Sequence, residues 1–186
     1  MLRVRNRLAA MHRVQLAAIA LFEGQGFAAV TVEEIAAAAE VSPISVYRWF
    51  GTKEGIVLWD DYDPPLFEAI ASELEAGSSP IEATRKGLER ELDRMYDVER
   101  EVVLRRARLI LREPALRAAA DANSFAMIEG LARLFGREAP AFEHKAMAGA
   151  IVGVLTQAIA EWTRRSGEVS LGELVKRGFA AMAGES

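Results

Sequence analysis

Hydrophobic residues recur along this chain at helical spacing over most of its length. An apolar stripe from Val14 to Phe22 predicts a first helix over residues 6–23, and Gly24 and Gly26 supply the flexible backbone that ends it. The same spacing predicts helices over residues 66–75, 81–99, 101–112, 114–135, 142–165 and 171–182. No segment alternates between apolar and polar residues as a half-buried strand would. Together with three short helices between residues 31 and 58, this pattern predicts an all-α fold of about nine helices.

The segment 31–54 carries the clearest local signals. Thr31 and Glu34 have the spacing of a capping box, in which each side chain bonds the other residue's backbone N–H. Ser42 is a favourable N-cap, and Pro43 suits the first helical position because its missing N–H would be unpaired there. The helix that follows, over about residues 43–49, is barely two turns long and needs neighbours to be stable. Thr52 then caps a third short helix.

Two short helices joined by a tight turn are the outline of a helix-turn-helix, whose second helix enters the major groove of DNA. Val46 and Phe50 are predicted to face inward, which leaves four side chains outside, those of Ile44, Ser45, Tyr47 and Arg48. We expect phosphate contacts from Thr31, Tyr47, Thr52 and Lys53, base-edge contacts from Ile44 and Ser45, and either kind from Arg48, with Ser42 at the same surface. The alternative is a helical hairpin whose aromatic residues only fill a core.

The net charge of −4 seems unsuited to DNA until it is divided along the chain. Residues 1–59 carry six basic and five acidic side chains, whereas residues 60–186 carry seventeen and twenty-two. Four arginines precede the first acidic residue, and Arg3 and Arg5 lead them. This basic N-terminal arm suits a phosphate backbone or a minor groove, or else is a solvated tail.

Residues 41–54 resemble the N-terminal signature of the TetR family of bacterial transcriptional regulators. The resemblance rests on Val41-Ser42, Val46–Phe50 and Thr52–Glu54, and it extends over roughly residues 8–58. It implies a three-helix DNA-binding domain whose third helix reads the major groove, followed by a helical domain that dimerises and holds a ligand. Glu40 stands where many relatives have glycine, and Ile44 stands where they often have a polar or basic residue.

A second resemblance, carried by residues 42–50 and 105–119, is to a TetR subgroup that includes regulators of mycofactocin genes. It implies a C-terminal domain that binds an acyl-CoA-like ligand. We therefore expect a DNA-binding domain at residues 1–55 and a ligand-binding and dimerisation domain at residues 56–186. The acidic, proline-containing segment from Asp60 to Pro65 predicts a break or kink near the boundary.

Apolar side chains of the middle helices are candidates for an effector pocket, although each also suits a plain core. They are Trp59, Tyr62, Phe67, Met95, Leu104, Phe125 and Met127. Arg105, Arg106 and Arg108 interrupt an apolar helix, and Arg108 shares a stripe with Leu104. A partly buried arginine needs an anionic partner, which is either a carboxylate of the protein or an acidic ligand. Arg108 therefore joins the candidate ligand-binding residues.

The apolar helix over residues 142–165 is the candidate for dimerisation. Gly149 and Gly153 form a G-x-x-x-G pattern that permits close helix approach, and Gln157 continues that face. The alternative is packing within one chain. A dimer is also expected because two recognition helices related by a twofold axis read a palindromic operator.

Other function classes find little support. The chain has no cysteine and two histidines, His12 and His144, which fall in different predicted domains. No metalloprotease, nucleophile-elbow or phosphate-loop motif is found, so we expect neither a metal, a cofactor nor an enzyme. The richest apolar run, residues 146–155, is too short for a membrane span, and no signal peptide is evident, so we expect a cytoplasmic protein. A ligand-gated repressor and a ligand-independent or partner-regulated DNA-binding protein both remain open.

Overall fold

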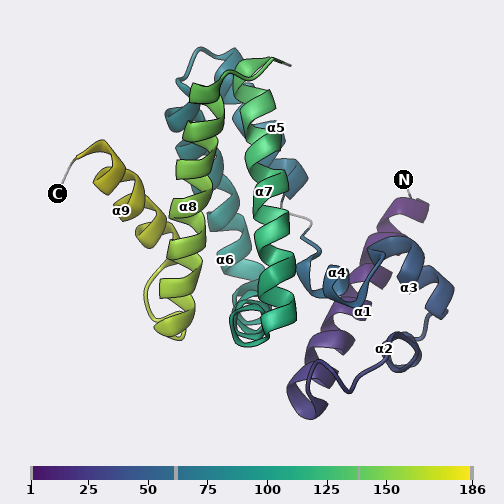
Figure 1. The fold of residues 1–186 in the computed structure, drawn as a ribbon. Helices are drawn as coiled ribbons and strands as arrows, with labels where there is room; N and C mark the ends of the chain where they lie inside the picture. Colours follow the sequence, from purple (N-terminus) through teal and green to yellow (C-terminus); the bar gives the residue numbers. More distant parts are fainter. Residues whose placement is uncertain (1, 61–62, 138, 185–186) are drawn as a thin grey trace. The chain divides into compact units, whose positions relative to one another are not determined.

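The structure, a computed structural model, describes residues 2–60, 63–137 and 139–184, without the side chains of residues 2–4, 63 and 93–99. Within these ranges every regular element is a helix, which confirms the predicted all-α class. The elements are α1 (Leu2–Gln25), α2 (Val32–Ala38), α3 (Pro43–Phe50), α4 (Lys53–Leu58), α5 (Asp63–Glu75), α6 (Pro80–Arg112), α7 (Pro114–Gly136), α8 (Phe142–Arg164) and α9 (Leu171–Ala183) (Figure 1).

The chain divides into two compact units. Unit 1 comprises residues 1–59 together with residues 108–120, and unit 2 comprises residues 60–107 together with residues 121–186. The division expected from the sequence, after residue 55, did not include residues 108–120 in the first part. They belong there because Leu109 and Leu116 are buried in the same apolar core as α1 to α4.

The core of unit 1 forms around α1. Val14, Ala18 and Phe22 of α1 are buried in one cluster with Ile35 of α2 and Val46 of α3. Helix α1 begins at Leu2, so the predicted start at Asn6 is wrong. Residues 2–5 carry no proline or glycine, and nothing in that segment prevents the helix from continuing toward the N-terminus.

The three short helices begin as predicted. Thr31 and Glu34 form the capping box of α2, Ser42 caps α3 through the N–H of Ser45, and Thr52 caps α4. The turn between α2 and α3 holds Glu40 at φ 55°. This left-handed conformation is the one that glycine adopts without strain, which explains why the family pattern has glycine at this position.

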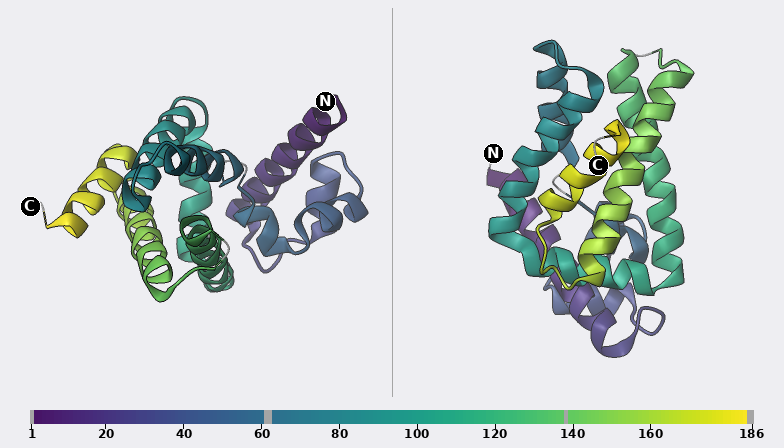
Figure 2. Two further views of the ribbon diagram at one scale, coloured as in Figure 1. Left: turned by 90° about the horizontal axis from the view of Figure 1, so that it is seen from above. Right: turned by 90° about the vertical axis from the view of Figure 1, so that its left-hand side faces the viewer.

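Unit 2 is a helical bundle. Its buried cluster joins Ile70 of α5, Leu104 of α6, Leu131 of α7, Trp162 of α8 and Val175 of α9. Figure 2 shows α7 and α8 as antiparallel neighbours and α9 lying against α8. The α8–α9 approach is close, since a Cβ added to Gly178 would lie 2.5 Å from Val154 Cγ1.

Two boundaries in unit 2 differ from the prediction. Helix α6 is continuous from Pro80 to Arg112, so the predicted break at residue 100 is wrong. The segment from residue 89 to 112 contains neither glycine nor proline, the residues that most often end a helix. Helix α5 begins at Asp63 and holds Pro64 and Pro65 in its first turn, where the missing N–H groups have no cost. The predicted kink falls between α4 and α5, but residues 61 and 62 lie outside the described residues.

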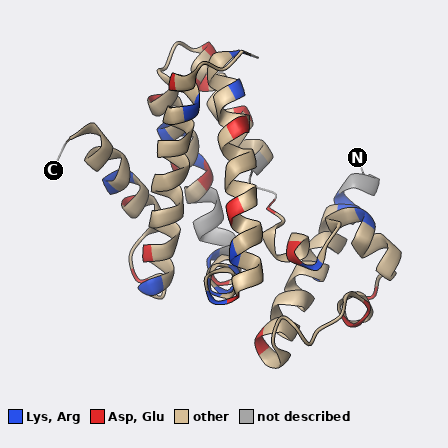
Figure 3. Cartoon of the chain, viewed as in Figure 1, with Lys and Arg blue, Asp and Glu red and all other residues tan. Residues whose placement is uncertain are grey.

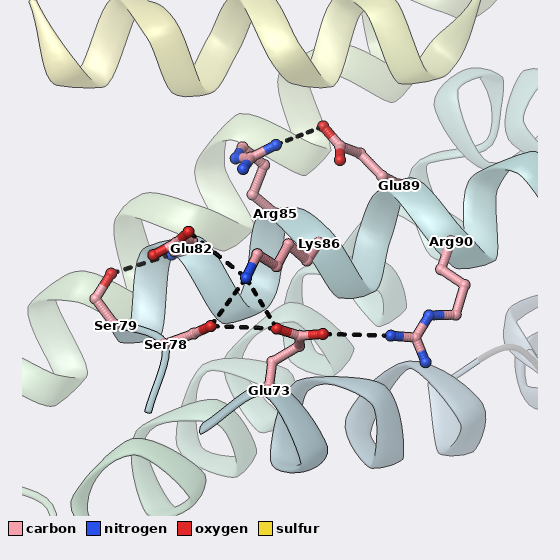
Figure 4. Close-up of polar contacts among 8 residues, drawn as sticks. All are labelled: Glu73, Ser78, Ser79, Glu82, Arg85, Lys86, Glu89 and Arg90. Carbon is pink, nitrogen blue, oxygen red and sulfur yellow. Dashed lines mark hydrogen bonds and ion pairs between the residues drawn. The ribbon is translucent and has the colours of Figure 1, made fainter. Parts of the chain in front are cut away.

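Ion pairs connect α5 to α6. Figure 4 shows Glu73 of α5 between Lys86 and Arg90 of α6, at 3.1 and 3.5 Å, while Ser78 also donates to its carboxylate. The hydrogen bond from Lys86 holds the pKa of Glu73 below its ordinary value. The same contact raises the pKa of Lys86. Charged residues of α6 therefore fix the α5–α6 hairpin.

Candidate nucleic-acid interface

Helix α3 presents an exposed face of three side chains. Ile44 is 77% exposed, Tyr47 is 49% exposed and Arg48 is exposed, while Val46 on the opposite side is 1% exposed. This confirms the outward orientation predicted for Ile44, Tyr47 and Arg48 and the inward one predicted for Val46. Arg48 is the single charged residue of α3, whose ribbon is mostly uncharged in Figure 3. A two-turn helix that keeps two large apolar or aromatic side chains in water is suited to a partner surface.

The hydroxyl groups at the start of α3 bond one another. Ser42 Oγ and Ser45 Oγ lie 2.9 Å apart, and Ser45 N–H donates to Ser42 Oγ at 3.2 Å. Ser45 is half-buried, whereas Ser42 is exposed. The pair fixes the first turn of α3, so both predicted DNA-binding serines have a structural role in the free protein.

Thr31 is exposed at the start of α2, where its hydroxyl is already engaged. Thr31 Oγ1 and Thr31 N–H both donate to Glu34 Oε2 at 2.8 Å, and Glu34 N–H donates back to Thr31 Oγ1 at 3.2 Å. The hydrogen bonds from Thr31, the backbone one first, lower the pKa of Glu34. The Thr31 hydroxyl has a single hydrogen, so a contact to a phosphate oxygen would have to replace its bond to Glu34.

Lys53 bonds the loop between α1 and α2. Its Nζ donates to the carbonyl oxygens of Phe27 and Val30 at 2.6 and 3.0 Å and lies 4.4 Å from the centre of the Phe27 ring. The side chain is half-buried. Sequence reasoning assigned Lys53 to phosphate binding alone and missed this contact, because a loop carbonyl 23 or 26 residues away leaves no local pattern. The phosphate role of Lys53 remains a prediction.

The turn from α3 to α4 depends on Gly55. Its N–H donates to Thr52 Oγ1 at 3.0 Å, and a Cβ built on it would lie 2.1 Å from the carbonyl oxygen of Phe50. No larger residue fits without moving backbone. Thr52 itself is exposed beside this turn, as its predicted phosphate contact requires.

The end of α4 is held by a residue that sequence reasoning did not single out. Gln15 of α1 is 5% exposed, and its Nε2 donates to the carbonyl oxygens of Trp59 and Ile56 at 2.8 and 3.0 Å. A third carbonyl, that of Val57, lies at 3.4 Å. The available signal was a lone polar residue beside Val14 in the apolar stretch of α1. This contact fixes the position of α4 against α1.

Trp59 follows α4 and belongs to unit 1. Its ring makes edge contacts with His12, at 4.9 Å between ring centres, and with Phe50, at 5.9 Å. Trp59 was expected to line an effector pocket among the middle helices. The structure instead places it against the end of α3.

The basic N-terminal arm is helical. Residues 2–7 are part of α1, so the arm is an ordered helix, and its contact with DNA stays a prediction. Arg5 is exposed on this helix, and the side chain of Arg3 lies outside the described residues. A helix cannot lie along a narrow minor groove as an extended strand can, so Arg5 would reach DNA through its side chain alone.

The predicted ligand-binding residues are dispersed. Leu104 is buried in the core of unit 2, and Phe67 and Met127 pack against that core. Phe125 is 66% exposed, which contradicts its predicted place in a pocket. Tyr62 and the side chain of Met95 lie outside the described residues. Among the described residues no group of three or more potential metal ligands is found.

The arginines of α6 are arranged differently from the prediction. Arg108 is exposed and belongs to unit 1, so its predicted partial burial beside Leu104 is wrong. Arg106 is the shielded member, and its guanidinium donates to the carboxylate of Asp60 within unit 2. A partly buried arginine was expected to pair with either a carboxylate of the protein or an acidic ligand. Arg106 pairs with a carboxylate of the protein. The 100° step between residues explains the error, because Arg106 and Arg108 lie on different faces of α6.

Helix α8 has an outer side of small residues. Nothing approaches the Cβ positions of Gly149 and Gly153 within 4 Å, and Gln157 is exposed on the same helix. Among the described helices, α8 has the length and apolar composition to cross a membrane, a test that core helices also pass. Ile151 and Trp162 on its other side are fully buried in unit 2.

The capped α2–α3 pair with its exposed α3 face defines a class, that of helix-turn-helix DNA-binding proteins. Residues 16–58 match the family described as bacterial regulatory proteins, tetR family, and residues 78–185 match the MftR C-terminal domain. The second match covers more than half of the chain. The chain therefore belongs to the TetR family of transcriptional regulators, which are not enzymes.

Individual relatives agree with this assignment. The chain is 35% identical to the HTH-type transcriptional regulator TcmR of Streptomyces glaucescens over 125 residues, which are 63% of this chain and 54% of TcmR. The match thus spans about half the length of TcmR. The chain is also 28% identical to a protein of Mycobacterium tuberculosis described as the mycofactocin biosynthesis transcriptional regulator MftR. This match covers 94% of this chain and 90% of that protein.

A solved structure shares the fold. FadR of Thermus thermophilus, a TetR family transcriptional repressor in complex with lauroyl-CoA, superposes with a TM-score of 0.61. The match covers 94% of each chain at 22% sequence identity.

Proposed function

We propose that the protein is a cytoplasmic, homodimeric repressor that binds a palindromic operator and is released from it by a small hydrophobic or acidic effector of the acyl-CoA type. The observation that carries the DNA-binding part is the exposed face of α3. Ile44, Tyr47 and Arg48 are presented by a helix that Ser42 caps and Val46 anchors. One such helix offers too few base contacts for specificity, so the proposal requires two copies.

The dimer is proposed to form through α8. Gly149 and Gly153 face open space, and small residues allow two helices to approach closely. Gly153→Leu tests this, because a leucine there would separate the two helices. Sedimentation velocity is expected to show a dimer for the wild type and a monomer for the variant, with Gly24→Leu on α1 as the control. A dimeric Gly153→Leu protein would contradict the interface.

The effector class rests on two supports. One is the match to the MftR C-terminal domain together with the lauroyl-CoA bound by the FadR structure. The other is the aromatic and apolar composition of the unit 2 core. There the Phe67 ring packs against Gly130, and a Cβ built on Gly130 would lie 3.3 Å from the ring atoms Cε1 and Cζ. The Phe67 ring can turn only if its neighbours move. An acyl chain that entered this core would displace the ring and so change the packing of α5 on α7.

The mechanism is proposed to be a population shift between two poses of the dimer. An effector acts only through its different affinity for the two poses. A coupling free energy of about 3 kcal/mol would lower DNA affinity about 150-fold. Gln15 holds α4 within unit 1, and Asp60, two residues after the end of α4, pairs with Arg106 in unit 2. Residues 56–60 are proposed as one place where a change in unit 2 would reach α4, beside the two other places where the chain passes from one unit to the other.

The test is release of operator DNA. The operator is first selected from random duplex DNA with the purified protein, and lauroyl-CoA, lauric acid and CoA are then added to the complex. Release by lauroyl-CoA at concentrations where lauric acid and CoA have no effect supports the acyl-CoA class. If none of the three has an effect and mass spectrometry finds no copurified ligand, the alternative holds, a ligand-independent or partner-regulated DNA-binding protein.

A further inference from the structure

Ile44 occupies the centre of the face that α3 exposes. Successive residues of an α-helix are about 100° apart, so Tyr47 and Arg48 lie about 60° and 40° to either side of Ile44. Val46, about 160° away, is buried in the core of unit 1. Ile44 at 77% exposed therefore projects directly away from the body of unit 1, and its two polar neighbours flank it.

The hydroxyl group of Ser45, the residue after Ile44, is already engaged. Ser45 lies about 100° from Ile44 around the helix and is half-buried, with its hydroxyl at 2.9 Å from Ser42 Oγ. The first turn of α3 thus presents a branched apolar side chain at its centre, and hydrogen-bonding groups stand only at its sides.

From this arrangement we infer that Ile44 selects the operator by contacting the 5-methyl group of a thymine in the major groove, an inference that rests on the proposed function. The thymine methyl is the apolar group on the major-groove edge of the bases. The other major-groove groups that distinguish the bases are hydrogen-bonding atoms, and an isoleucine against them would displace water without replacing its hydrogen bonds. Ile44 is thus a specificity-determining residue, while Tyr47 and Arg48 are placed for phosphates or adjacent base edges.

The experiment removes the methyl group alone. Each thymine of the selected operator is replaced by deoxyuridine, one symmetric pair of positions at a time, and affinity is measured by fluorescence anisotropy. At one pair of positions the wild type is expected to bind about fourfold more weakly for each half-site, or about 16-fold for both, the ratio expected for one buried methyl group. Ile44→Ala is expected to bind the thymine and deoxyuridine duplexes equally well.

Controls separate this inference from the proposed function. Ile81→Ala, an equally conservative change at an exposed isoleucine of α6, should keep the full thymine preference. Circular dichroism melting checks that both variants fold. If specific binding survives every deoxyuridine replacement, or if Ile44→Ala retains the thymine preference, the inference about Ile44 is overturned and the regulator function stands. If selection yields no preferred sequence, the proposed function fails and the inference fails with it.

Discussion

Replacing Gln15 by methionine removes the hydrogen bonds that hold the end of α4, while the side-chain volume is almost unchanged. Gln15 is 5% exposed and its contact to the carbonyl oxygen of Ile56 is buried, so water cannot readily replace the amide there, whereas the contact to Trp59 is partly buried. The amide has two hydrogens, which match these two shorter contacts, and the 3.4 Å contact to Val57 adds little.

The expected cost follows from the number of carbonyls left without a donor. A buried acceptor that loses its partner costs about 1–3 kcal/mol. Two such carbonyls would cost about 2–6 kcal/mol in the free energy of unfolding, and we expect the lower part of this range, about 2–4 kcal/mol, because the Trp59 contact is only partly buried. This is a large part of the 5–15 kcal/mol that is typical of a folded domain.

Urea unfolding followed by circular dichroism measures this loss, and operator affinity is measured on the same samples under conditions where the protein is folded. Gln25→Met, the same substitution at an exposed position of α1, is the matched control and should change stability by less than about 0.5 kcal/mol. Affinity of Gln15→Met is expected to fall as well, because α4 supports the α3–α4 turn. If Gln15→Met is as stable as Gln25→Met, the inference that this contact fixes α4 is refuted.

Three further changes test other contacts. Gly55→Ala places a Cβ against backbone, so it should lower the free energy of unfolding by about 3 kcal/mol and weaken DNA binding. Its control is Gly24→Ala inside α1, where a Cβ meets nothing within 4 Å and should stabilise the protein by about 0.5–1 kcal/mol. Equal effects of the two variants in thermal or urea unfolding would exclude the clash. Lys53→Met should destabilise unit 1, because its hydrogen bonds to the loop between α1 and α2 are lost. If Lys53 also contacts a phosphate, the slope of log affinity against log salt should flatten by about one unit. An unchanged slope would mean that the role of Lys53 is purely structural. Glu73 has a lowered pKa in the folded state, so its stabilising contribution is complete above the ordinary carboxyl pKa and is lost as the pH falls through the folded-state value. The melting temperature of Glu73→Gln should therefore fall less than that of the wild type between pH 6 and pH 3, while Glu75→Gln should behave as the wild type does; parallel curves for all three proteins would contradict the Glu73 contact.

The local signals of the sequence were sufficient for the helix-turn-helix. Capping by Thr31, Ser42 and Thr52 and the anchoring of Val46 depend on residues at most four positions apart, which a sequence shows directly. The exposed face of α3 followed from the same helical period. The all-α class was predictable for the same reason.

Long-range contacts were not predictable in this way. The bonds from Gln15 to the end of α4 join residues 41 and 44 positions apart, and those from Lys53 reach back 23 and 26 positions. The inclusion of Leu109 and Leu116 in the core of unit 1 is of the same kind. The burial predicted for Arg108 was wrong because it was inferred from the stripe that Arg108 shares with Leu104. Leu104 belongs to unit 2, whereas Arg108, four residues further along α6, belongs to unit 1.

The most direct test of the central claim is fluorescence anisotropy of the purified protein on its own upstream DNA and on a scrambled duplex, across a salt series. The proposed function predicts tight binding to the upstream DNA alone, two subunits per site, and an affinity that falls as salt rises because phosphates are neutralised. Equal and weak binding to both duplexes, at every salt concentration and with Tyr47→Phe indistinguishable from the wild type, would contradict the assignment of the α3 face to operator recognition.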